Sequence, residues 1–301
     1  EKAIKIEPNY ADAHNNLGIV LSLLGEDQKA IHHYKQAIEI NPKDLNAHTS
    51  IGATYQKLGE RQKAINSYKK VIEIDPNFKT AYYNLGSIFI DELEGYQKAV
   101  SYFEKVIEID SNDVDSYWGM FSISSGIEEA LSILKKIYKI DNQHIRAKIM
   151  ISAVEGYKGN FVQFNDLLAS HVSTHPYTRS AKWIFSLPKL PKIFFNRVDF
   201  FDAVVALSDS SRPFYEFGVW NAVSFKYLLN TFKKGFGFDT FTGIPEAWYN
   251  EPKGAYSSFG LVPKIKGGEF IVGKFEDTLP DFFSKERPMA SLINFDADLY
   301  S

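Results

Sequence analysis

The chain of 301 residues is long enough for about two domains of roughly 150 residues each, and it can bury a core without covalent staples. Its 34 Lys and Arg residues against 37 Asp and Glu give a formal net charge of −3, which leaves no basic footprint for nucleic-acid binding. The absence of cysteine excludes disulfides and thiolate metal sites and fits a reducing, cytoplasmic location, and no apolar run reaches the about 18 residues of a membrane span.

A period of 34 residues runs through the first part of the chain. Pro8, Pro42 and Pro76 close the similar phrases AIKIEP, AIEINP and VIEIDP. The pattern resembles the tetratricopeptide repeat, a helix–turn–helix unit of 34 residues. Its small and large packing positions hold Gly18, Leu17, Leu21, Ala30, Tyr34 and Ala37, then Gly52, Ile51, Tyr55, Ala64, Tyr68 and Val71, then Gly86, Ala99 and Phe103.

The repeats predict an α-solenoid over residues 1–178. Gly25 and Gly59 are expected to end first helices with positive φ. Residues 1–10 match only the end of a unit, so the chain is expected to begin inside a repeat. The third unit, 79–113, has an inserted residue, the fourth, 114–144, is shortened near Ser124–Gly126, and the fifth, 145–178, ends near Pro176. Such divergence is typical of terminal, capping repeats.

Stacked repeats form a groove lined by their first helices, and the resemblance implies that this groove binds a protein or peptide partner. Asn16, Ser50 and Asn84 occupy equivalent groove positions. In similar repeats of protein O-glycosylating enzymes, a ladder of asparagines at this position holds a peptide backbone. The alternative is that these residues are ordinary polar side chains on a solvated face. His14 and His48 stand where a large aromatic is usual, which favours a packing role.

The rest of the chain has a different composition, because eighteen of the 24 Phe residues follow residue 178. Residues 179–212 form a predicted linker, broken by Pro188 and Pro191 and containing a helix over 197–207. Strands are then expected at 213–219, 235–241, 269–275 and 291–300, with helices at 222–232 and 278–284. This alternation predicts a partial α/β, Rossmann-like domain with a parallel sheet over residues 213–301.

Acidic residues follow the predicted strands, where open α/β sheets bind ligands. They are Glu216, Asp239, Glu276, Asp277, Asp296 and Asp298. Gly218 would let the backbone approach a ligand closely. The segment EFGVWNAVS has a single glycine rather than the G-x-G-x-x-G of dinucleotide enzymes, so a ligand without a pyrophosphate is favoured over NAD.

The segments EFGVWNAVS, GFDTFTGIPEAW, GKFEDTLPDFF and INFDADLYS resemble class I S-adenosylmethionine-dependent O-methyltransferases of the macrocin type. The resemblance implies that Glu216 and Gly218 face the methionine and ribose of S-adenosylmethionine, and that Asp239 holds the ribose. It places Phe275, Glu276 and Asp277 around the adenine. Asp296 and Asp298 would bind Mg²⁺ and act in catalysis on a sugar or other small-molecule hydroxyl. One aspartate would serve as the base.

The resemblance has departures and alternatives. Ala222 stands where the family usually has a second glycine, and the family's downstream acids are missing after Ser301, so a fragment cut at both ends and inactive is expected. The strand-end acids have an alternative as helix caps. The aromatic loop 244–260 is either a substrate lid or a packed surface loop; it carries Trp248, Tyr249, Tyr256 and Phe259. Two functions therefore stay open: a methyltransferase whose repeats recruit a partner, and a non-catalytic repeat scaffold with a degenerate α/β domain.

Overall fold

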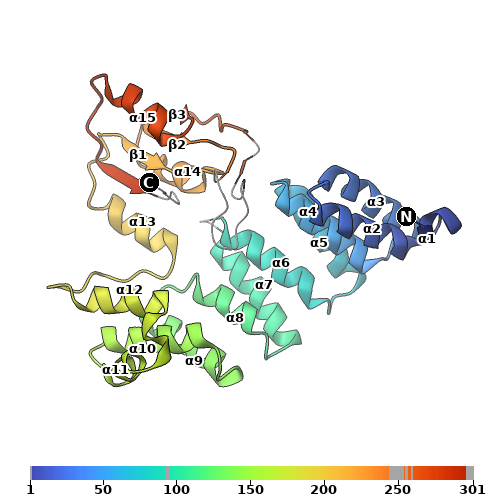
Figure 1. The fold of residues 1–301 in the computed structure, drawn as a ribbon, viewed down its shortest axis with the longest axis horizontal. Coiled ribbons are helices and arrows are strands. Elements are labelled where there is room, and N and C mark those ends of the chain that lie inside the picture. The colour runs from blue at the N-terminus through green and yellow to red at the C-terminus, as the bar shows by residue number, and fades with distance from the viewer. Residues whose placement is uncertain (1, 93–94, 244–253, 255–256, 259, 296–301) are drawn as a thin grey trace. The chain divides into compact units, whose positions relative to one another are not determined.

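The computed structural model describes residues 2–92, 95–243, 254, 257–258 and 260–295. The chain divides into two compact units, residues 1–196 and 197–301. The predicted linker 179–212 is therefore shared between the two units, its first part belonging to the larger and its helix to the smaller. Each unit is described by itself below (Figure 1).

The larger unit consists of helices joined by short turns. After α1 (Lys2–Ile6), helices follow in pairs, which confirms the predicted helical repeat array. The pairs are α2 (Ala11–Leu23) with α3 (Asp27–Ile40), α4 (Leu45–Lys57) with α5 (Arg61–Ile74), α6 (Lys79–Ile90) with α7 (Tyr96–Ile109), α8 (Val114–Phe121) with α9 (Ile127–Ile140), and α10 (Ile145–Tyr157) with α11 (Val162–Leu168). A 3-10 turn (His171–Thr174) and α12 (Pro176–Phe185) follow.

Close contact within each of the first three pairs explains the recurring glycine. A Cβ added at Gly52 would lie 2.7 Å from a ring atom of Tyr68, too close for any real contact. The same relation joins Gly18 to Tyr34 and Gly86 to Phe103. The three rings are buried, so a large side chain from the second helix fills the space that glycine leaves on the first. The predicted packing positions are confirmed.

The turns inside the repeats also follow the prediction. Gly25 and Gly59 have φ of 80° and 71°, a conformation that glycine adopts without steric cost at helix ends. Asp44 precedes α4, and its Oδ1 accepts a hydrogen bond from the N–H of Ala47 at 3.1 Å. Asp113 caps α8, two repeats further along, in the same way: its Oδ1 accepts a hydrogen bond from the N–H of Ser116. These caps satisfy helix-end N–H groups that would otherwise lack partners.

His14 and its repeat equivalents fasten the first helices of the first three pairs to the turns before them. His14 is buried, and its Nε2 lies 3.0 Å from the carbonyl oxygen of Pro8. His48 makes the same contact to Pro42 at 3.1 Å. In the third pair the phenol of Tyr82 donates to the carbonyl of Pro76 at 3.0 Å. The structure thus supports the packing role predicted for both histidines.

The fourth and fifth pairs differ from the others. Helix α8 ends at Phe121, and the turn Ser122–Gly126 follows, as the predicted shortening requires. The fifth pair departs from the prediction, because Pro176 begins α12 rather than closing a repeat. Proline suits that place because the first helical residue has no intrahelical use for an N–H group. Helix α12 packs on α10 at the end of the array.

The smaller unit contains a parallel sheet, as predicted. Its elements are α13 (Arg197–Val205), β1 (Phe214–Phe217), α14 (Val223–Leu228), β2 (Gly235–Asp239), β3 (Gly268–Val272), α15 (Phe275–Phe283) and β4 (Leu292–Phe295). The strand order is β3-β2-β1-β4, and every described pairing is parallel. Phe214 of β1 is in register with Gly235 of β2 and Leu292 of β4.

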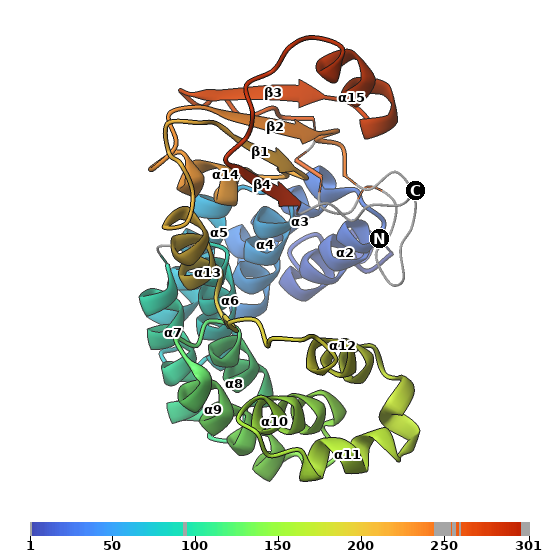
Figure 2. The ribbon, with the colours of Figure 1, turned by 90° about the vertical axis from the view of Figure 1, so that its left-hand side faces the viewer.

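Alternating side chains of β1 build a core on each face of this sheet. Phe214 points to α14, where its ring lies 4.8 Å from that of Phe225, and Tyr215 points to α15, 6.0 Å from Phe282. Successive residues of a strand face opposite sides, so α14 and α15 cover opposite faces (Figure 2). On the α14 face, Gly235 and Gly237 leave room for the rings of Phe214 and its neighbours.

Several predicted boundaries in this unit were wrong. Helix α15 begins at Phe275 rather than Thr278, because Gly273, with φ of 141°, ends the strand early. Glu276 and Asp277 therefore lie in the first turn of a helix, where carboxylates interact favourably with the helix dipole. Helices α13 and α14 are also shorter than predicted, and Leu207, expected on the apolar side of α13, lies beyond its end and is exposed.

Candidate functional site

The three predicted groove residues lie on successive first helices of the array. Asn16 is on α2, Ser50 on α4 and Asn84 on α6, at the same position of each repeat. Asn16 is exposed, and the other two are half-buried. Within the described part of the chain, none of the three side chains makes a hydrogen bond to another protein group. Three polar groups thus repeat along one line with their hydrogen-bonding capacity unused.

Next to Asn84 lies a second polar group, Tyr83, which was not among the residues predicted from the sequence. The phenol of Tyr83 lies near Ser87 of the same helix and near Asp115 of α8. Burial raises the pKa of the Tyr83 phenol, the Asp115 carboxylate raises it further, and the hydrogen bond to Ser87 lowers it. The residues before Asn16, Ser50 and Asn84 are Asn15, Thr49 and Tyr83, so comparison of the repeats at this adjacent position would have revealed Tyr83.

An ion-pair network joins the third and fourth pairs beside this surface. The ammonium of Lys79 lies 2.5 Å from Asp110 and 3.2 Å from Asp113. The hydrogen bond from Lys79 lowers the pKa of the Asp110 carboxyl, and the backbone N–H of Asn112 adds to that effect. Asp115 is exposed and makes no ion pair within the described residues. Its carboxylate is therefore available to a ligand at the step from α6 to α8, the first helices of the third and fourth pairs.

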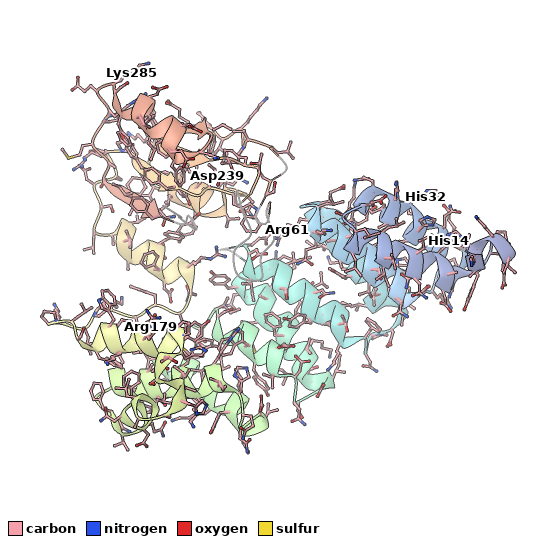
Figure 3. The ribbon with its side chains drawn as sticks, in the orientation of Figure 1. His14, His32, Arg61, Arg179, Asp239 and Lys285 are labelled. Atoms are coloured by element: carbon pink, nitrogen blue, oxygen red, sulfur yellow. The ribbon has the colours of Figure 1, made fainter. Side chains whose placement is uncertain are left out.

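The second candidate site is the edge where the strands of the smaller unit end. Asp239 closes β2, and Figure 3 labels it at this edge. Its Oδ2 accepts hydrogen bonds from the N–H groups of Val219 at 2.7 Å and Trp220 at 2.8 Å, and its Oδ1 accepts one from Phe241 at 2.6 Å. The carboxylate therefore fastens the loop after β1 to the turn after β2.

That loop has an unusual backbone. Gly218 has φ of 85°, and Trp220, Ala222 and Phe241 adopt positive φ of 46°, 61° and 57°. Positive φ is uncommon for residues other than glycine and costs free energy unless the surroundings enforce it. The hydrogen bonds from Trp220 and Phe241 to Asp239 supply that enforcement. Ala222 thus takes a conformation that glycine would adopt more easily.

Glu216 is fully buried inside the smaller unit. Its Oε1 accepts hydrogen bonds from the hydroxyl of Ser224 and, at 3.1 Å, from the amide of Asn294. The carboxylate therefore links β1 to α14 and β4. Because Glu216 is buried and bonded inside the unit, it does not lie at the sheet edge. Of the predicted residues discussed so far, Gly218 and Asp239 do.

The remaining predicted residues are placed less favourably or not at all. The ring of Phe275 packs 5.8 Å from that of Phe217, while Glu276 is exposed beside Lys274 and Asp277 is exposed one residue further. Asp296 and Asp298 lie outside the described residues, as do the aromatic residues of the predicted lid; these are Trp248, Tyr249, Tyr256 and Phe259. Among the described residues, no three His, Asp or Glu side chains gather to hold a metal ion. No described helix is long and apolar enough to cross a membrane.

Comparisons with known proteins address the array. No curated protein matches the chain. Solved structures similar to it include YrrB, described as a tetratricopeptide-repeat protein with an unusual peptide-binding site, at 22% identity over 62% of this chain and 97% of that one, with a TM-score of 0.48. MamA from Desulfovibrio magneticus RS-1 is 18% identical over 55% and 97%, with a TM-score of 0.45, and another MamA structure is 23% identical over 60% and 98%, with a TM-score of 0.43.

Family models identify the repeats directly. Models described as the tetratricopeptide repeat match residues 11–44, 45–78 and 80–113. These ranges correspond to the three regular helix pairs, with their glycine and aromatic packing positions. Residues 11–113 of this chain are built of tetratricopeptide repeats.

Proposed function

We propose that the repeat array binds an extended segment of a protein partner along α2, α4 and α6. The observation that supports this function is the line of Asn16, Ser50 and Asn84, whose side chains recur once per repeat and have no hydrogen-bond partner among the described residues. An asparagine amide both donates and accepts, so it matches the N–H and C=O groups of an extended backbone. Neutral groups of this kind form hydrogen bonds with the partner's backbone and place little restriction on its side chains.

The step from α6 to α8 would add side-chain selectivity to this interaction. Tyr83 presents a phenol and Asp115 a carboxylate that makes no ion pair within the described residues. A partner side chain that donates hydrogen bonds or carries positive charge would complement them. The function that the chain supports best is therefore that of a protein-interaction scaffold.

Selection of a random 12-residue peptide library on the immobilised chain tests this proposal. Peptides selected on the natural chain should bind the triple variant Asn16→Ala, Ser50→Ala, Asn84→Ala about 100-fold more weakly, because three hydrogen bonds of about 1 kcal/mol each are lost. Affinities would be measured by fluorescence anisotropy with labelled peptides.

A matched control makes the same kind of substitution on the second helices of the three pairs. The variant Gln36→Ala, Asn66→Ala, Gln97→Ala removes one amide each from α3, α5 and α7 and should bind the selected peptides as the natural chain does. Failure to select any peptide, or equal weakening in both triple variants, would contradict the proposed groove.

We propose as a second candidate that the smaller unit binds S-adenosylmethionine. Support comes from the parallel order β3-β2-β1-β4, because ligands of open α/β sheets bind beyond the carboxyl ends of the strands, where the order reverses beside β1. Gly218 is half-buried and has no side chain at that edge, so a ligand could approach its backbone closely. Asp239 retains acceptor capacity for a ribose hydroxyl, since its Oδ1 accepts only the hydrogen bond from Phe241 and can accept one more.

In this candidate function the residues have distinct tasks. Asp239 would hold the ribose and keep the loop after β1 in place. Glu216 would hold the far end of that loop through its hydrogen bond with Ser224 of α14. Asp277 and Phe275 would border the adenine. The bound cofactor supplies an activated methyl group, and alignment of a sugar or other hydroxyl acceptor would be the main task of the protein. Asp296 and Asp298 are the proposed Mg²⁺ ligands, which suits a chain that offers only oxygen and imidazole groups to metals.

Calorimetric titration tests this candidate. S-adenosylmethionine should bind saturably while NAD does not, and Asp277→Ala should weaken binding about tenfold. Asp281→Ala is the matched control, because it removes an exposed carboxylate one turn further along α15 and should leave the affinity unchanged. If S-adenosylmethionine does not bind at millimolar concentration, this second candidate is wrong, and the protein-interaction scaffold remains as the proposed function.

A further inference from the structure

The chain between α12 and α13 returns along the array instead of leaving it. Residues 186–196 contain no helix or strand and carry Pro188 and Pro191, which favour extended backbone. Figure 2 shows this segment running from α12 back toward α8. We call residues Pro191–Asn196 the strap. All of the strap lies in the larger unit.

Three contacts hold the strap on the fourth and fifth helix pairs. At its start, the phenol of Tyr157 in α10 donates a hydrogen bond to the carbonyl of Pro191 at 2.8 Å. In its middle, the ring of Phe195 meets the ring of Phe121 in α8 edge to face, with centroids 5.8 Å apart. At its end, the amide of Asn196 donates to the carbonyl of Ser124 at 2.9 Å.

The shortened fourth repeat creates the place where the strap binds. Helix α8 stops at Phe121, so the carbonyl of Ser124 lies in a turn where its residue is almost fully buried. A buried carbonyl without a partner costs free energy, and Asn196 satisfies it. Phe195 packs against the apolar cluster of α8, α9 and α10. The missing helical turn is therefore compensated by a segment more than 60 residues further along the chain.

These contacts have the form of a peptide bound to a repeat array: one backbone carbonyl bonded by the array, one aromatic anchor, and one side-chain amide bonded to the array's backbone. We propose that the strap is an internal ligand that occupies the first helices of the fourth and fifth pairs and closes them to an outside segment of the same chemistry. The proposal builds on peptide binding by the array, but it concerns α8 and α10 rather than α2, α4 and α6.

A peptide with the sequence of residues 187–197, LPKLPKIFFNR, tests this internal occupancy. The labelled peptide should bind the full chain carrying Phe195→Ala and Asn196→Ala. It should bind the natural chain at least tenfold more weakly, because the tethered strap competes at an effective concentration on the order of millimolar. A peptide with alanine at the same two places should bind neither chain. The variant Trp183→Ala, which truncates an exposed side chain on α12, should behave as the natural chain does.

Trypsin gives a second measurement that does not depend on the peptide. Tyr157→Phe removes only one hydroxyl, and cleavage between Lys192 and Ile193 should become about fivefold faster than in the natural chain, with an unchanged circular dichroism spectrum. Equal peptide binding by the natural and doubly substituted chains, or cleavage insensitive to Tyr157→Phe, would show that the strap is a permanent part of the repeat core. Because this probe differs from the library peptides, its failure would leave the groove on α2, α4 and α6 untouched.

Discussion

Phe103→Ala should lower the free energy of unfolding by about 3–5 kcal/mol, the usual cost of truncating a buried aromatic residue. The ring of Phe103 is fully buried and fills the space left by two glycines, Gly86 of its own pair and Gly119 of the next. Neither glycine has a side chain that could fill the cavity left by the ring. Tyr83, whose ring lies 5.8 Å away, would lose its packing partner as well.

Urea denaturation followed by circular dichroism would measure this loss. Tyr177→Ala serves as the control, because that side chain is 41% exposed on α12 and its removal should change stability by less than about 1 kcal/mol. A Phe103→Ala chain as stable as the control would contradict the packing of the third pair against the fourth.

Asp239→Ala should destabilise the smaller unit by about 2–4 kcal/mol, because three backbone N–H groups lose a charged acceptor at once. Trp220 and Phe241 would also lose the hydrogen bonds that hold their positive φ. Hydrogen exchange should show this directly, with much faster exchange of the Val219, Trp220 and Phe241 amides and no change in the repeat array.

Asp239→Asn is the conservative control for this prediction. It keeps one acceptor oxygen with the shape of the side chain, so amide protection should be partly retained. If the alanine variant preserves the protection of all three amides, Asp239 does not organise the loop. Loss of S-adenosylmethionine binding in Asp239→Ala alone would therefore not identify a ribose contact, because the loop changes with it. That is why Asp277 and Asp281 are the better pair for the ligand test.

The repeat array was predictable from the sequence because its contacts are local. Glycine and a large side chain that pack together, such as Gly52 and Tyr68, lie within one unit of 34 residues and recur with the period. Gly25 and Gly59 likewise mark turns whose geometry depends on the residue itself. Where the period weakens, prediction weakened too: Pro176 begins a helix because the fifth pair no longer follows the common spacing.

The α/β unit was predictable in class but not in detail. Alternating strands and helices predicted the parallel sheet, whereas the order β3-β2-β1-β4 depends on pairings between distant segments. The helix that contains Phe275, Glu276 and Asp277 started earlier than expected because Gly273 ends the strand, and propensity alone does not place such a boundary.

By itself the sequence determined the repeat length, the packing positions of the array and the presence of a second, phenylalanine-rich α/β unit. Only the tertiary structure decided what the individual polar groups bind. Besides the nearby Phe241, Asp239 accepts from Val219 and Trp220, about twenty residues earlier in the chain. Besides the nearby Ser224, Glu216 accepts from Asn294, and Asn196 donates to Ser124, both across more than seventy residues. A periodic pattern records contacts between neighbours along the chain, whereas the partner of a buried polar group is whichever segment folding brings to it.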